Sequence, residues 1–285
     1  MILYFLTAMA LVAFAANSVL CRLALGDGSI DPVSFTSIRL VGGALALSLI
    51  FWFTKVSEKV EKPQGSWSSG VALYAYAVSF SLAYISLSSG TGALILFGAV
   101  QITMLLAAFR SGEQMGWRQW VGFFVAIAGI IYLVSPGIEA PDLGGAVLMM
   151  ISGVAWGLYS IAGKSVTAPI AMTTGNFIRA AIITVPTSIC ALAFVNISSF
   201  GVALALTSGV VTSGLGYVIW YKAVPLLTTT QAAILQLLVP LLAALGGVVF
   251  ISEQFTLRLG IASLLILGGV VFSICAKQKH GSAAN

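Results

Sequence analysis

Neutral polar and aromatic side chains recur inside segments that are otherwise apolar. Their amides, hydroxyls and rings could hold a small solute: Asn17, Tyr76, Ser79, Tyr84, Gln101, Trp156, Tyr159, Ser213, Tyr217 and Gln236. Each unsatisfied polar group in an apolar surrounding costs several kcal/mol, so these groups must meet one another or line a wet space. Neutral amides and hydroxyls beside aromatic faces suit a small zwitterion with an apolar or aromatic side group.

Every one of these residues also has a structural interpretation. A hydrogen bond between two membrane helices contributes about 0.6 kcal/mol on average, and for any single serine or threonine this role is favoured. The amides of Asn17, Gln101 and Gln236 carry more hydrogen-bonding groups than a hydroxyl, so for them the two interpretations balance.

Two arginines, Arg39 and Arg179, stand inside apolar segments. Each lies about eight residues from its segment's start, or roughly 12 Å at 1.5 Å per residue, where a charge costs about 2.5 to 3.5 kcal/mol. A substrate carboxylate or a carbonyl end could stabilise either one. We favour arginines that snorkel to an interface or cap carbonyls, and a gating role stays open. Pro240 should bend its helix, and Gly246 and Gly247 should serve packing or a hinge.

The remaining reactive side chains argue against an enzyme. His280, the one histidine, lies in the tail, and the three cysteines lack the spacing of a metal site. We therefore expect no catalytic residue, no metal and no cofactor. Glu113 and Glu253 each precede an apolar segment, where an acid complements a helix start. No acid stands within a segment, although proton-driven membrane carriers commonly use one. If the chain is a carrier, facilitated export is therefore at least as consistent as proton coupling.

The composition places these residues in a membrane protein. Of the 285 residues, 59% are hydrophobic and 7% are charged, against about 25% charged in soluble domains. Segments near the ~20 residues that cross a bilayer cover 2–22, 32–54, 69–88, 91–110, 117–135, 143–163, 171–194, 199–220, 229–250 and 257–276. We predict an all-α polytopic protein with ten transmembrane helices in a lipid bilayer. Its basic residues are scattered, which argues against nucleic acid.

Several residue patterns repeat along the chain at one period. Arg39 and Arg179 are 140 residues apart, as are Glu113 and Glu253. Such a period is about half the chain and indicates an internal duplication. Because each half holds an odd number of spans, the second half should be inverted in the membrane. We predict two five-helix repeats, 1–138 and 139–280, and a frayed tail, 281–285.

The distribution of basic residues predicts the orientation. If the N-terminus is cytoplasmic, the inner loops and the tail hold nine Lys or Arg residues and the outer loops hold two. This asymmetry follows the positive-inside rule. Both termini should therefore face the cytoplasm.

These markers resemble the drug/metabolite transporter superfamily of EamA type over nearly the whole chain. The second repeat is similar in Trp156 with Lys164, in Arg179, and in Pro240 followed by Glu253. The first repeat resembles it in Phe14, Arg22, Arg39, Glu113, Gly122 and Gly129. Gln101 stands near the place of the family's first proline, and Ser252 replaces the glycine before the second glutamate.

Within that superfamily the chain looks most like the YddG-type exporters of aromatic and other amino acids. The resemblance implies a multi-pass carrier of the bacterial inner membrane that exports small metabolites by alternating access. A multidrug or organic-cation exporter is the alternative in the same class, and a non-transporting membrane helper is the alternative from another class. The oligomeric state stays open, and a monomer is compatible with the sequence.

Overall fold

Apolar helices follow one another along the whole chain in a computed structural model. It describes residues 2–58, 60–112, 116–137, 139–163, 167–223, 226–227 and 235–281. Glu113, Lys164, Gln231 and the tail from residue 282 lie outside the described residues. The elements are α1 (Ile2–Gly26), α2 (Pro32–Glu58), α3 (Trp67–Ala83), α4 (Ser89–Arg110), α5 (Trp117–Val134), α6 (Leu143–Ala162), α7 (Pro169–Cys190), η1 (Leu192–Phe194), α8 (Ser199–Thr207), η2 (Ser208–Leu215), α9 (Gly216–Ala223), α11 (Leu238–Ile251) and α12 (Leu257–Gly281).

Short polar side chains set where several helices begin. The Ser88 hydroxyl accepts the Thr91 N–H at the start of α4, and the Asp142 carboxylate accepts the Gly145 N–H at 2.6 Å at the start of α6. Such N-caps satisfy amide groups that have no partner within the helix. The short connections therefore reverse the chain and send the next helix back across the bundle.

Seven helices of the described residues are long and apolar enough to cross a membrane. They cover 2–26, 32–54, 89–110, 117–134, 143–162, 199–220 and 257–275, and α11 is a shorter apolar helix. The α3 helix has 17 residues. The expected count of ten transmembrane helices therefore stays a prediction, while the all-helical, multi-pass character agrees with the sequence.

The span 199–220 contains a π-helix that the sequence did not predict. After α8 the chain widens into η2 and then continues as α9. Single π-type turns within α-helices are frequent at functional sites. In this one the neighbouring residues Thr212 and Ser213 are both buried in the bundle.

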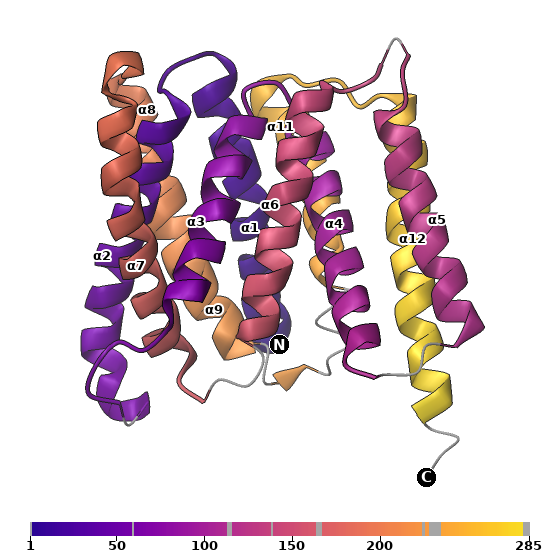
Figure 1. The fold of residues 1–285 in the computed structure, drawn as a ribbon, viewed down its shortest axis with the longest axis horizontal. Helices are drawn as coiled ribbons and strands as arrows, with labels where there is room; N and C mark the ends of the chain where they lie inside the picture. The colour runs from indigo at the N-terminus through magenta and orange to yellow at the C-terminus, as the bar shows by residue number, and fades with distance from the viewer. Residues whose placement is uncertain are drawn as a thin grey trace.

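The helices pack in a pattern that relates distant parts of the chain. The α6 helix packs against α3 and α4, and α1 packs against α11 and against the rod formed by α8, η2 and α9. The α2 helix contacts α7. The α5 helix contacts α12, and these two lie side by side at the right-hand side of the bundle (Figure 1). We call the end of the bundle where α1 passes into α2 the upper end, and the opposite end the lower end.

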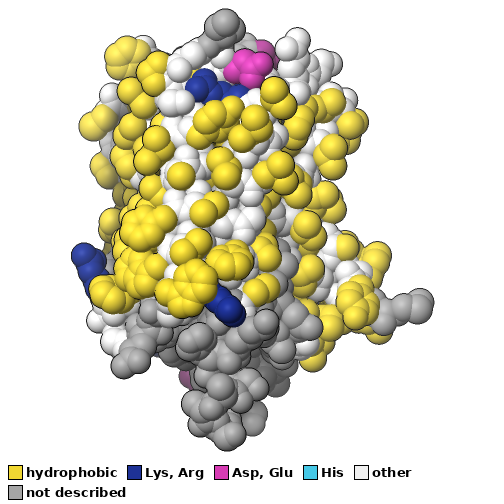
Figure 2. Space-filling model, turned by 90° about the vertical axis from the view of Figure 1, so that its right-hand side faces the viewer, with side chains coloured by type: hydrophobic (Ala, Val, Ile, Leu, Met, Phe, Trp, Pro, Cys, Tyr) yellow, Lys and Arg dark blue, Asp and Glu magenta, His cyan; other side chains and the backbone are white. Residues whose placement is uncertain are grey.

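The outer surface is apolar between the two ends. The face formed by α5 and α12 carries a continuous band of hydrophobic side chains, and the charged side chains lie above and below it (Figure 2). Phe124 and Leu264 are among the exposed apolar residues. Such a large exposed apolar surface fits contact with lipid.

Two adjacent glycines of α12 provide a test of this packing. A Cβ on Gly269 would lie 2.6 Å from the Gly122 carbonyl oxygen on α5, whereas a Cβ on Gly268 would meet nothing within 4 Å. Gly269→Ala should therefore destabilise the protein by about 1 to 3 kcal/mol, the usual cost of overpacking. Gly268→Ala should be neutral or slightly stabilising, because alanine favours the helix. Thermal unfolding in detergent would compare the two, and equal unfolding temperatures would contradict the close α5–α12 contact.

Candidate functional site

A cavity of about 340 Å³ lies inside the bundle between the two halves of the chain. Its walls come from α1, α2, α3, α4, α6, α7, η2 and α9, with Gln236 beside them. The volume is near the lower limit of ligand pockets, which span about 300 to 1,000 Å³. A small solute is therefore the cargo that would fit.

Sequence-predicted residues from six separate elements, together with Gln236, meet at this cavity. The lining includes Asn17, Arg39, Tyr76, Trp156, Tyr159, Ser213, Tyr217 and Gln236. Tyr76, Tyr159 and Tyr217 are buried, and Trp156 is half-buried. Substrate binding by these residues stays a prediction, but their convergence from both halves of the chain gives it a location.

Aromatic rings form one wall of the cavity. The Trp156 and Tyr217 rings stack with centroids 5.5 Å apart and an angle of 13° between their planes. Trp156 also contacts Tyr159 at 5.4 Å and Tyr76 at 4.8 Å. The ring centroids of Phe14 and Tyr217 lie 5.8 Å apart. This wall offers flat apolar faces to a solute, as in pockets that hold aromatic or aliphatic groups.

The polar wall is built by α1, α2 and the π-helix. The Asn17 side-chain oxygen accepts the Ser208 hydroxyl at 2.6 Å and the Thr212 hydroxyl at 3.2 Å. Arg39 donates through Nη2 to the Tyr76 hydroxyl at 3.0 Å and through Nε to the Ser213 hydroxyl at 3.4 Å. Because the side chain of Arg39 is only 2% exposed, the expectation that it snorkels to a membrane interface is wrong.

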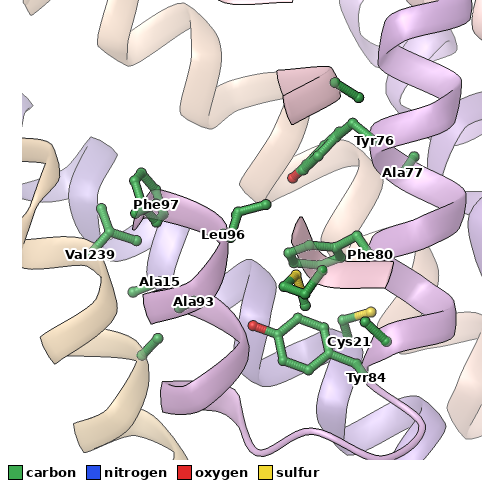
Figure 3. Close-up of a cluster of buried hydrophobic side chains, with 14 of the residues drawn as sticks. Ala15, Cys21, Tyr76, Ala77, Phe80, Tyr84, Ala93, Leu96, Phe97 and Val239 are labelled. Atoms are coloured by element: carbon green, nitrogen blue, oxygen red, sulfur yellow. The ribbon is translucent and has the colours of Figure 1, made fainter. Parts of the chain in front are cut away.

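The upper end of the bundle is closed above the cavity. Figure 3 shows Tyr76, Phe80 and Tyr84 in succession along α3, with Cys21 beside Tyr84. The Tyr84 side chain is completely buried, and its hydroxyl donates to the Ser89 carbonyl. These buried side chains therefore lie between the cavity and the upper surface.

A set of charged contacts, here called the upper cluster, joins four helices at this end. Arg22 of α1 approaches the Glu253 carboxylate at 3.4 Å and donates to the carbonyls of Tyr84 and Ile85. The same carboxylate accepts the Ser89 N–H at about 2.9 to 3.0 Å, at the start of α4. Glu253 was expected to complement the helix that follows it, α12. It instead caps α4, because the left-handed turn at Ser252 directs the chain back over that helix start.

Toward the lower end the cavity reaches the ends of the helices. Its lining there includes Gly163, the C-cap of α6, and Pro169, the first residue of α7. Trp220, near the end of α9, lines the same region. The cavity therefore extends toward the lower end of the bundle.

Three predicted residues lie outside the lining. Ser79 donates to the Ala75 carbonyl at 2.6 Å within α3, Tyr84 belongs to the upper closure, and Gln101 is buried on α4. The hydroxyls of Ser79 and Tyr84 therefore bond to backbone carbonyls and not to groups of the cavity.

The expected gating residues occupy packing positions. Arg179 donates through Nη1 to the carbonyls of Gly175 at 2.8 Å and Gln64 at 3.1 Å, so it caps carbonyls. A Cβ on Gly246 would lie 2.7 Å from Val19, and one on Gly247 would overlap Glu253. Pro240 was expected to bend its helix. In the described residues, the helical residues 235 and 236 are followed by a turn at 237, and Pro240 stands in the first turn of α11, where a backbone N–H is not needed.

Sequence reasoning missed several lining residues. These are chiefly Phe14, Ser18, Phe80, Leu96, Phe97, Met104, Thr173 and Trp220. Phe14 carried a signal, since it precedes Arg22 by eight residues as Trp156 precedes Lys164. Leu96 and Phe97 carried no such signal, because the residues of α4 are apolar on every side of the helix.

Comparison with known proteins gives consistent matches over the whole chain. Residues 1–135 and 143–275 each match the EamA-like transporter family. An uncharacterized protein of Pseudomonas aeruginosa, PA1977, is 45% identical over 275 residues, covering 95% of this chain and 94% of its own. A solved crystal structure covers 96% of this chain and 98% of its own, with a TM-score of 0.65 at 20% identity, a likeness that shows the fold alone.

Two more distant relatives have names that state a cargo. One is a probable terminal-alkyne amino-acid exporter of Streptantibioticus cattleyicolor, 24% identical over 250 residues, which are 85% of this chain and 83% of its own. The other is a probable amino-acid metabolite efflux pump of Escherichia coli, 21% identical over 285 residues, which are 94% of this chain and 93% of its own. The two family matches together span nearly all of the sequence. This multi-pass membrane protein therefore belongs to the EamA-like transporter family.

Proposed function

We propose that the chain is a secondary transporter that exports neutral amino acids, aromatic ones among them, and similar small metabolites. The observation that carries this proposal is the cavity, where an aromatic wall and a wall of amide and hydroxyl groups face one another. A zwitterion with an apolar side group matches both walls. The amino-acid cargo in the names of the two relatives supports the same class.

The proposed mechanism is alternating access between two inverted five-helix repeats. If the two halves are exchanged, α6 corresponds to α1, α3 to the α8–η2–α9 rod, and α4 to α11. The packing of α6 on α3 and α4 then corresponds to the packing of α1 on the rod and on α11. Both pairings are present. The family matches also fall into two successive segments of similar length. Inverted repeats allow one sequence to form inward-open and outward-open states around a central site.

The described conformation corresponds to the inward-facing state of this cycle. The upper cluster and the α3 aromatics close one end, and the cavity reaches the lower end. We place both termini in the cytoplasm and the protein in the bacterial inner membrane, in line with the positive-inside rule. Opening of the upper cluster would then release cargo to the outside.

The charges around the cavity favour amino acids over organic cations. Arg39 is the charged residue of the described lining, which contains no acidic side chain. A carrier for cations needs a buried acid or an aromatic cage without a competing positive charge. The proposal therefore assigns neither an organic-cation cargo nor a proton-carrying acid to the described site.

A counterflow assay tests the proposed function. Purified protein in liposomes that are loaded with unlabelled phenylalanine, threonine or methionine should accumulate the matching labelled amino acid. The uptake should saturate and should be absent from protein-free liposomes, because exchange requires a binding site. No uptake across the panel, with protein shown to be folded and inserted, would contradict the proposal and favour a non-transporting helper.

A further inference from the structure

Arg39 carries a positive charge into the centre of the bundle without a carboxylate partner. Its side chain is 2% exposed and borders the cavity. Among the described residues the ion pair is Arg22 with Glu253, and no described acid pairs with Arg39. A buried charge without a partner is strongly disfavoured, so the position of Arg39 calls for a functional explanation.

The hydrogen bonds of the guanidinium leave it under-satisfied. Arginine has five N–H donors, and two of its nitrogens reach Tyr76 and Ser213. The third, Nη1, is buried with no hydrogen-bond acceptor in the described part of the chain. The rings of Tyr76 and Phe80 lie 5.3 and 5.2 Å from the guanidinium carbon. They offer cation–π contact and no negative charge.

The two acceptors of Arg39 are themselves donors. Since the oxygens of Tyr76 and Ser213 accept from the guanidinium, their own protons are left to point elsewhere. Neither hydroxyl donates to an acceptor within the described residues, and both line the cavity. Two O–H donors, polarised by the charge of Arg39, therefore border the same cavity.

Asn17 adds a further donor nearby. Its side-chain oxygen is occupied by the hydroxyls of Ser208 and Thr212, which leaves its amide N–H₂ group to the cavity. The polar wall thus offers donors and a positive charge, with no described acid. This is the chemistry of an anion site.

Arg179 shows what an arginine with a purely structural role looks like in this fold. It stands 140 residues after Arg39 and is only partly buried. Two backbone carbonyls accept from its Nη1 at 2.8 and 3.1 Å. It does not line the cavity. The contrast indicates that Arg39 keeps unmet hydrogen bonds because it stands beside the cavity.

We propose that Arg39, Tyr76 and Ser213, here called the Arg39 cradle, bind the carboxylate of the transported amino acid. This inference rests on the proposed function and specifies its cargo further. The carboxylate accepts from the Tyr76 and Ser213 hydroxyls, and the Arg39 charge behind them stabilises it through the low dielectric of the bundle. The carboxylate, rather than the amino group, is then the part of the cargo that cannot be omitted.

Competition with paired analogues of phenylalanine tests the cradle in the counterflow assay. Phenylalaninamide lacks the carboxylate, and 3-phenylpropionate lacks the amino group. Phenylalaninamide should compete at least about tenfold more weakly than phenylalanine, the factor that loss of a charged hydrogen bond carries. By contrast, 3-phenylpropionate should still compete. Equal competition by phenylalanine and phenylalaninamide would overturn the cradle and leave the proposed function standing.

Substitutions assign this selectivity to the cradle. Arg39→Gln should raise the half-saturating concentration of phenylalanine about ten- to a hundredfold and abolish the preference over phenylalaninamide. Arg179→Gln is the matched control, which should lower thermal stability yet keep the preference. Where Arg39→Gln does not fold, Tyr76→Phe combined with Ser213→Ala removes the two donors and keeps the charge. A folded cradle variant that keeps the preference would overturn the inference.

A binding measurement separates the cradle from the proposed function. In detergent, 3-phenylpropionate should raise the unfolding temperature of the wild-type protein and leave Arg39→Gln unchanged. If no amino acid is transported but this shift is seen, the cradle stands and the proposed cargo is wrong. If neither transport nor a shift by any organic carboxylate is seen, both are overturned.

Discussion

Replacing Trp156 with alanine is expected to lower the transport of aromatic amino acids by up to about tenfold while leaving the protein folded. The Trp156 ring contacts Tyr217, Tyr159 and Tyr76. A cargo ring placed on the cavity face of Trp156 would add one more aromatic contact, which contributes about 0.5 to 1.5 kcal/mol, and about 1.4 kcal/mol corresponds to a factor of ten in affinity. Loss of this surface should therefore raise the half-saturating concentration in the counterflow assay. Because Trp156 is only half-buried beside a cavity, its removal should disturb packing less than a core substitution would.

A lipid-facing tryptophan provides the matched control. Trp117 lies at the start of α5 and its side chain is 66% exposed, so Trp117→Ala should leave the transport rate unchanged. Gln236→Ala should impair transport as well, since the Gln236 side chain lines the same cavity. Normal rates in both Trp156→Ala and Gln236→Ala would remove these residues from the proposed site.

Patterns that depend on chain order were accessible from the sequence. Helix positions followed from the lengths of the apolar segments, and the observed bounds of α1, α2, α5 and α6 lie close to the predicted ones. Trp156 and Tyr217 could be proposed as site residues because aromatic and polar groups are conspicuous in an apolar span. The structure adds that they stack on one another, although 61 residues separate them in the chain.

The direction of each side chain was not accessible. Ser79 and Tyr76 lie three residues apart on α3, yet the Ser79 hydroxyl turns back to its own helix while Tyr76 reaches the cavity. In a helix that is apolar all round, periodicity does not identify an inward face. For the same reason Gln101 on α4 was placed at the site by residue type alone.

Long-range partners were also out of reach. Glu253 has a local interpretation as a helix-start residue, but its carboxylate binds an amide at Ser89, 164 residues away.

The π-helix could not be predicted either, since nothing in the residues from Ser208 to Leu215 distinguishes it from a regular helix. That extra width lets Thr212 and Ser213 approach Asn17 and Arg39 respectively.

Neutralising Glu253 is expected to open the upper end of the bundle. Glu253→Gln removes the ion pair with Arg22 and weakens the cap on Ser89. Hydrogen bonds to charged groups contribute about 1.5 to 3 kcal/mol, so the balance between conformations should shift about tenfold or more toward the outward-open state. In a background with Cys21, Cys190 and Cys275 replaced, a Ser18→Cys probe in the cavity should then react faster with a membrane-impermeant thiol reagent added outside.

The control for this experiment is another carboxylate at the same end. Glu139 is exposed and accepts the Arg258 N–H at 3.3 Å, away from the cavity. Glu139→Gln should therefore leave the labelling rate of the probe unchanged. Unchanged labelling in Glu253→Gln, together with a lower unfolding temperature, would make Glu253 a helix cap without a gating role. If Glu253→Gln instead abolished the pH dependence of transport at normal yield, Glu253 would be a proton site, and the upper cluster would couple opening to protonation.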